Sequence, residues 1–164
     1  MKRNIFVAAL LIFFVGCSPQ QSDQLNQQQK DQITNEVKAV VDSALARMQR
    51  LDGDGALQYY SPEMVAVGDS SIIDFQAYKK GWTDLPKSVA TMKWTTTQCQ
   101  CMVLTKDLAY SSLFGKAEML MKSGDKITVD PQIYTSIFKR VGNQWKIIYE
   151  HGSGVPVIQK AGKK

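Results

Sequence analysis

The sequence predicts an α+β domain: a cone-shaped, strongly curved antiparallel sheet with a long N-terminal helix and short helices packed on its concave face. Three observations predict this fold class. An amphipathic helical stretch comes first, four long strand-like segments follow it, and only short turns separate those segments. Because short turns join neighbours that run in opposite directions, the strands should form a meander.

The first helix is indicated by apolar residues at spacings of three and four from Ile33 to Met48, which form one stripe along a helix. Asp31 is expected to cap its start, and the DGDG sequence at 52–55 to end it. A second helix is expected at 56–60, because the residue before Pro62 avoids the helical region. A third is expected to start after Asp74 and run through Tyr78 to Trp82.

Two short strands are predicted at 64–67 and 71–73, on either side of a Gly-Asp turn. Four long strands are predicted at the ranges 90–104, 108–122, 127–140 and 144–151. Strands of this length must bend, and Gly115 and Pro131 are the expected bulges or kinks. A helix laid on the concave side of such a sheet should leave a cone-like cavity at the wider end.

Residues 1–16 have the order of an export signal: Lys2 and Arg3, an apolar run at 5–15, then a small Gly16 before Cys17. The apolar run is shorter than the roughly 20 residues that span a bilayer. The end of the run resembles the bacterial lipobox, which implies that Cys17 is lipidated and anchors the chain to a membrane of the cell envelope. In a Gram-negative cell, Ser18 resembles an outer-membrane address facing the periplasm. The alternative is an ordinary secretory signal.

The rest of the chain divides into a lipidated Cys and Gln-rich tether at 17–31, one globular domain at 32–157 and a basic tail at 158–164. The net charge is +5, and Lys2 and Arg3 would leave with the signal. No basic run favours nucleic acid as a partner. The expected partners are therefore the membrane and a small ligand or another protein.

The remaining cysteines, Cys99 and Cys101, should lie on one face of a strand as packed thiols, with redox or metal roles as alternatives. The DGDG turn matches part of a calcium-binding loop, but Ala56 and Leu57 stand where a ligand and a sharp-turn glycine are needed. A single histidine offers no zinc site. We expect neither a metal nor a cofactor.

Two stretches resemble the nuclear transport factor 2-like superfamily, in particular its SnoaL-like branch: LDGDGALQYYSPEMVAVGD at 51–69 and YTSIFKRVGNQWKIIYEHGSG at 134–154. The resemblance implies the cone fold and a homodimer formed through the outer face of the sheet. It does not fix an activity, because the superfamily includes isomerases, cyclases, dehydratases, ligand binders and dimerisation modules.

The resemblance also places the base of enolising members at Gly68, beside Asp69, and the arginines of an anion-binding pocket at Ser136 and Gly152. Those catalytic and anion-binding groups are thus missing. His151 with Glu150 could supply acid–base chemistry instead, since imidazole titrates near neutral pH. The alternative is that His151 anchors the end of the last strand.

Side chains at the wide end of the cone are better candidates for a ligand surface than His151 is. The alternative is that these large aromatic residues belong to the hydrophobic core. The candidates are Tyr60, Trp82, Trp94, Tyr110, Tyr134 and Tyr149, with Glu118 and Ser136 as polar contacts.

The sequence therefore favours a non-catalytic, membrane-tethered domain that binds a small apolar ligand or a partner protein. The alternative is a SnoaL-like enzyme of the isomerase, dehydratase or hydrolase type that uses His151 with a nearby carboxylate. A cone filled by side chains, with no cavity of ligand size, would remove the small-molecule version of the first hypothesis and leave the partner version. The second requires His151 and a carboxylate to share one pocket.

Overall fold

The computed structural model describes residues 25–68 and 71–162, so the expected signal, Cys17, Asp69 and most of the expected tether lie outside the described residues. Among the residues it describes, no helix has both the length and the apolar character needed to cross a bilayer. The elements in chain order are α1 (Gln27–Gln49), α2 (Gly53–Leu57), β1 (Tyr60–Val67), β2 (Ile72–Asp74), α3 (Phe75–Ser88), β3 (Val89–Thr105), β4 (Leu108–Met121), β5 (Lys126–Val141), β6 (Gln144–Ser153) and β7 (Pro156–Gln159).

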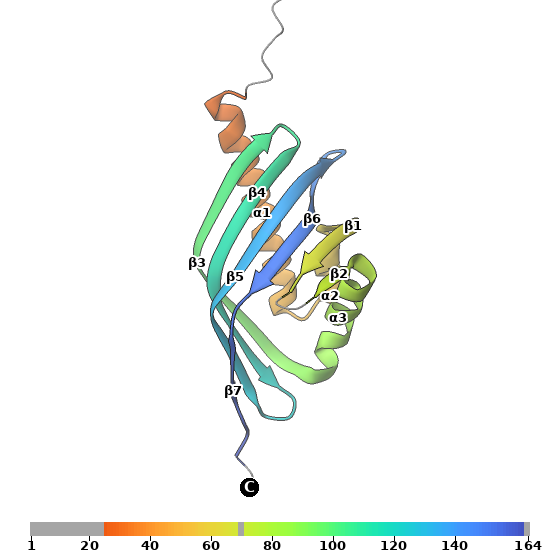
Figure 1. Ribbon diagram of the computed structural model, residues 1–164, viewed down its shortest axis with the longest axis vertical. Coiled ribbons are helices and arrows are strands. Elements are labelled where there is room, and N and C mark those ends of the chain that lie inside the picture. Colours follow the sequence, from red (N-terminus) through yellow and green to blue (C-terminus); the bar gives the residue numbers. More distant parts are fainter. Residues whose placement is uncertain (1–24, 69–70, 163–164) are drawn as a thin grey trace, which may run out of the picture.

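One curved sheet contains all the strands, in the order β2-β1-β6-β5-β4-β3, with β7 paired to β5 (Figure 1). The predicted antiparallel meander from β3 to β6 is confirmed. The sheet is mixed rather than wholly antiparallel, because β1 pairs with β6 in parallel. Since β2, α3 and the strands β3 to β5 separate β1 from β6 in the chain, the connection is long enough for parallel pairing.

The long strands bend where the sequence predicted. The register of β4 against β5 shifts just after Gly115. A Cβ atom on Gly115 would lie 2.5 Å from Cζ2 of Trp94, so only glycine lets the indole lie against the strand at this point. At Pro131 the strand beside β5 changes, because β7 pairs with β5 as far as Val129 and β6 pairs from Ile133 onward.

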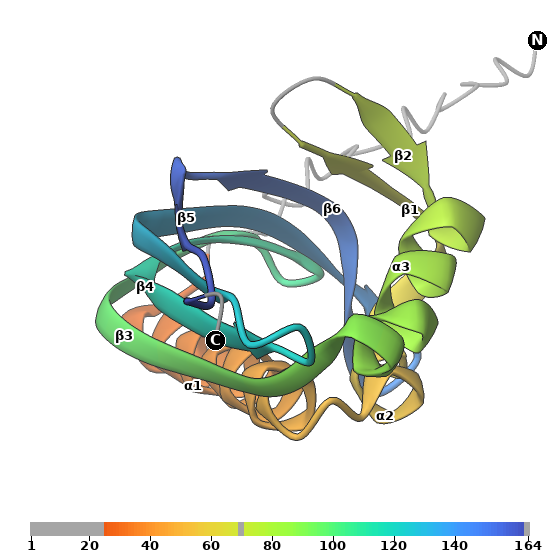
Figure 2. The ribbon, with the colours of Figure 1, turned by 90° about the horizontal axis from the view of Figure 1, so that it is seen from below.

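Helix α1 lies along the inner side of the curled sheet (Figure 2), and its buried stripe consists of Ile33, Val37, Val41, Ala44 and Met48, as predicted. The helix starts earlier than predicted. Asn26, not Asp31, is the N-cap, and it exchanges capping-box hydrogen bonds with Gln29. Gln27–Lys30, expected to be tether, are therefore helical.

A polar contact fixes α1 against the β5–β6 hairpin. Arg140 Nη2 lies 2.6 Å and Trp145 Nε1 2.8 Å from the same carboxylate oxygen of Glu36, and the Arg140 guanidinium sits 4.5 Å from the centre of the Trp145 ring. The hydrogen bond from Trp145, together with those from Gln32 and Arg140, lowers the pKa of Glu36 against the opposing effect of burial. This cluster positions the helix over the cone without using the apolar stripe.

Candidate functional site

A β-bulge in β6 decides which side chains of this strand enter the cone. Ile147 is buried and pairs with Phe138, but the next pair is Tyr149 with Ile137, so Ile148 has no partner on β5. The extra residue reverses the alternation of side chains along the strand. Glu150 consequently faces the interior, where it is 7% exposed, while its neighbours Tyr149 and His151 face outward.

Glu150 receives two hydrogen bonds from tyrosines on different elements. The hydroxyl of Tyr60, from β1, donates to Oε2 at 3.0 Å, and the hydroxyl of Tyr78, from α3, donates to Oε1 at 2.6 Å. The two hydroxyl oxygens are themselves 3.1 Å apart. Both carboxylate oxygens are thereby satisfied, as a buried carboxylate requires.

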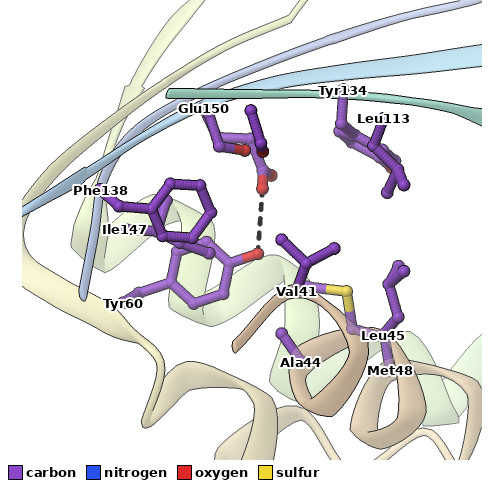
Figure 3. A pocket seen from close by; sticks show the side chains of 12 residues that line it. Val41, Ala44, Leu45, Met48, Tyr60, Leu113, Tyr134, Phe138, Ile147 and Glu150 are labelled. Atoms are coloured by element: carbon purple, nitrogen blue, oxygen red, sulfur yellow. Dashed lines mark hydrogen bonds between the residues drawn. The ribbon is translucent and has the colours of Figure 1, made fainter. Parts of the chain in front are cut away.

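Glu150 and Tyr60 form part of the wall of a cavity of about 30 Å³ between the sheet and α1, whereas Tyr78 lies outside the lining (Figure 3). Glu150, Ser136 and Ser111 lie side by side along the inner face of β6, β5 and β4, because each pairs with the next. Tyr60 and Tyr134 add two further hydroxyls. The remaining wall is apolar and is made of Val41, Ala44, Leu45, Met48, Leu113, Phe138 and Ile147.

The electrostatics of the site are set by burial. Removal from water raises the pKa of Glu150, and the hydrogen bonds from Tyr78 and Tyr60 only partly oppose that rise. Burial, with the nearby Glu150 carboxylate as the next cause, also raises the pKa values of Tyr60, Tyr78 and Tyr134. Within the described part of the chain, no lysine, arginine or histidine forms an ion pair with Glu150.

The structure brings four of the sequence candidates together in this cavity: Tyr60, Tyr134, Ser136 and Glu150. Trp94 lies behind Tyr134, with 5.4 Å between the ring centres. Trp82 lies behind Tyr78 on α3, at 6.2 Å. These two tryptophans support the aromatic residues of the site rather than line the cavity.

The other candidates face away from it. Tyr110 and Glu118 alternate with buried residues of β4 and so point to the outer face, where Tyr110 shares a 2.6 Å hydrogen bond with Ser112 and Glu118 pairs with Lys116 at 2.9 Å. Tyr149 and His151 are turned outward by the bulge. The pair of His151 and Glu150 suggested for acid–base chemistry is therefore not assembled, since the two side chains lie on opposite sides of the sheet.

Tyr78 and Ser111 were not predicted as site residues, although the sequence pattern around each of them indicates that it faces the interior. Phe75, Tyr78, Trp82 and Leu85 recur at helical spacing after the Asp74 cap, which marks the apolar face of α3. In β4 the buried residues alternate strictly, with Ser111 among them. Because side chains alternate between the two faces of a strand, the positions of Ala109 and Leu113 place Ser111 on the inward face.

Cys99 and Cys101 are free, half-buried thiols, and burial, with the neighbouring Cys99, raises the pKa of the Cys101 thiol to about 12. The Cys101 thiol therefore resists ionisation and does not resemble a reactive thiol. Over residues 25–68 and 71–162, no three histidine, cysteine or acidic side chains gather as metal ligands would.

The raised pKa of Glu150 predicts a specific pH dependence of stability. The Glu150 carboxyl group binds its proton more tightly in the folded protein than in the unfolded chain, where its pKa is about the ordinary 4.5. The free energy of unfolding therefore falls as the pH rises from 4.5 through the raised pKa. Glu150→Gln removes this titration. In this pH window, the free energy of unfolding of the variant, measured by urea denaturation, should rise relative to that of the wild type by up to about 1.4 kcal/mol per pH unit.

Glu118→Gln is the matched control on the outer face. Its hydrogen bond to Lys116 lowers the pKa of Glu118, so this variant should lose stability relative to the wild type as the pH rises through the ordinary range. A stability difference between Glu150→Gln and the wild type that does not change with pH would contradict the buried site.

Comparison with known proteins agrees with this architecture. The family model of the SnoaL-like domain matches residues 37–158. A protein from Novosphingobium aromaticivorans with the provisional name scytalone dehydratase is 8% identical, with a TM-score of 0.69 over 79% of this chain and 88% of that one. An NTF2-like protein of unknown function from Pseudomonas putida is 19% identical, with a TM-score of 0.63 over 75% of this chain and 87% of that one. A hexachlorocyclohexane dehydrochlorinase from Novosphingobium barchaimii is 11% identical, with a TM-score of 0.61 over 75% of this chain and 88% of that one.

Comparison with curated protein sequences found no match. The structural likenesses, at such low identity, establish the fold alone. The family model, in contrast, spans the second half of α1 and the strands β1 to β6, and it ends at residue 158 within β7. The chain therefore belongs to the SnoaL-like domain family, within the nuclear transport factor 2-like fold.

Proposed function

We propose that this protein is a non-catalytic binding domain, tethered in the cell envelope, that captures one end of a small molecule in the Glu150 cavity. One observation carries the proposal: a buried carboxylate, with no cation paired to it among the described residues, forms part of the wall of an otherwise mostly apolar cavity. A few polar groups set in apolar walls are what small-molecule sites use to orient a ligand.

The size of the cavity limits what it can hold. Pockets that enclose a whole drug-sized ligand measure roughly 300–1,000 Å³, whereas this cavity measures about 30 Å³. The small apolar ligand expected from the sequence could therefore enter this cavity only in part. The cavity accepts a head group of a few atoms, and the rest of such a molecule must lie outside it.

A fragment screen by NMR tests this function. Fragments should shift the side-chain signals of Leu113 and Tyr134 in the wild type, and Ser136→Leu should abolish those shifts by filling the cavity. His151→Ala, on the outer face, should bind as the wild type does. Shifts confined to the outer face, or lost in His151→Ala, would contradict the proposal.

An enzymatic function has one observation in its favour. Burial raises the pKa of Glu150, and a carboxyl group tuned in this way can act as a general acid or base. Two proteins of similar fold are named for elimination chemistry, a dehydratase and a dehydrochlorinase. If the fragments of the screen are converted into new species by the wild type but not by Glu150→Gln, this function replaces the first.

The tether is part of the proposal and rests on the sequence around Cys17. The wild type should take up a labelled fatty acid and sediment with membranes, because two acyl chains suffice for stable anchoring. Cys17→Ser should remove both the label and the sedimentation. An unlabelled wild-type protein would show that the signal belongs to ordinary secretion.

We also propose that the domain forms a homodimer through the outer face of the sheet. A row of apolar side chains crosses five strands there, each paired with the next: Val65, Tyr149, Ile137, Tyr110 and Met102. Met102 is 58% exposed and Val65 38%, which is unusual for large apolar residues on a single surface. A monomer in sedimentation equilibrium would contradict the dimer.

A further inference from the structure

We propose that the Glu150 cavity recognises a primary ammonium head group, the positively charged end of a short alkylamine. This inference rests on the proposed function and adds the chemical class of the ligand. It is carried by three properties of the cavity: the kind of hydrogen-bonding atoms on its wall, the charge of the wall and the volume enclosed.

Apart from the Met48 thioether, the polar side-chain atoms of the lining residues are oxygens. They belong to the Glu150 carboxylate and to the hydroxyls of Ser111, Ser136, Tyr60 and Tyr134. An ammonium group has three donors and no acceptor, so it needs such a set of oxygens around it. Ser111 is 1% exposed and Ser136 5%, and both side chains line the cavity. A hydroxyl oxygen has two lone pairs, so each serine can accept a hydrogen bond from a ligand.

The charge of the wall favours a cation. Glu150 carries the one ionisable carboxyl group of the lining, and the nearest ionisable neighbours are tyrosines, which stay neutral because burial raises their pKa values. A buried carboxylate bonded only to neutral donors leaves its charge uncompensated. A cationic ligand would supply the missing opposite charge, whereas a carboxylate or phosphate ligand would add a second negative charge in the same cavity.

The volume selects a small cation with an apolar stem. A water molecule needs about 10–15 Å³ of such space, so the cavity of about 30 Å³ holds two or three non-hydrogen atoms. An aminomethyl or aminoethyl group fits this limit, and a quaternary ammonium does not. Val41 and Leu113 on the apolar wall would contact the methylene groups of the stem.

NMR titration with ethylammonium and ethanol tests the inference, because these probes have the same number of non-hydrogen atoms and differ in charge. Ethylammonium should shift the methyl signals of Val41 and Leu113 and bind more tightly than ethanol, by about tenfold or more. Glu150→Gln should remove that preference, while the control Glu118→Gln should keep it. Tetramethylammonium, which is too large, should not shift these signals.

The possible failures are distinguishable. Equal binding of ethanol and ethylammonium, or a preference that survives Glu150→Gln in a variant with wild-type folding, overturns the ammonium inference and leaves the binding function standing. Binding of tetramethylammonium as tight as that of ethylammonium places the cation outside the cavity and also overturns it. If neither probe nor any screened fragment shifts the cavity signals, the proposed function itself fails.

Discussion

The bulge at Ile148 is the constraint on which the interior of this domain depends. Strict alternation from Trp145 and Ile147 would turn Tyr149 and His151 inward and Glu150 outward. Because Ile148 has no partner on β5, Glu150 instead points inward, and Tyr149 and His151 point outward. Because of this single bulge, the cone contains the carboxylate of Glu150 and not the imidazole of His151. The bulge thereby determines the kind of chemistry that the cavity supports.

Burying Glu150 is costly, and the surrounding fold shows how that cost is offset. A carboxylate removed from water needs hydrogen bonds to both oxygens, and these come from β1 through Tyr60 and from α3 through Tyr78. No side chain of α3 is fully buried. The hydrogen bond from the Tyr78 hydroxyl is therefore a main attachment of this helix to the interior. The Tyr78 ring adds contacts with the rings of Tyr60 and Trp82. The polar site consequently ties a peripheral helix to the sheet.

Much of this fold could be predicted from the sequence because it depends on local patterns. The stripe of α1, the four long strands, the Asp74 cap and the kink at Gly115 each follow from spacing or from a residue with special backbone freedom. The parallel pairing of β1 with β6 could not be predicted, since it joins strands far apart in the chain. The start of α1 was misplaced because glutamines that look like a tether also form good helices when Asn26 caps them.

The site was predictable only in part, for the same physical reason. Tyr134 and Ser136 follow the ordinary alternation of β5 and enter the cavity. Tyr60 also enters it, but as the first residue of β1 and not as the end of the helix predicted at 56–60, since α2 ends at Leu57. Tyr110, Tyr149, Glu118 and His151 were assigned from residue type, which says nothing about the face they occupy. A bulge without glycine or proline, such as the one at Ile148, leaves no mark in the sequence. The identity of the buried acid therefore emerged only from the strand register.

The pKa of the Glu150 carboxyl, measured by carbon-detected NMR titration, tests the account most directly. A buried Glu150 should titrate with a midpoint above the ordinary 4.5, and the midpoint should be higher still in Tyr78→Phe, because that variant loses a hydrogen bond that favours the charged form. A midpoint at or below 4.5 in the wild type would show that burial does not dominate the pKa of Glu150, and would contradict the desolvated carboxyl group on which the account of the cavity rests.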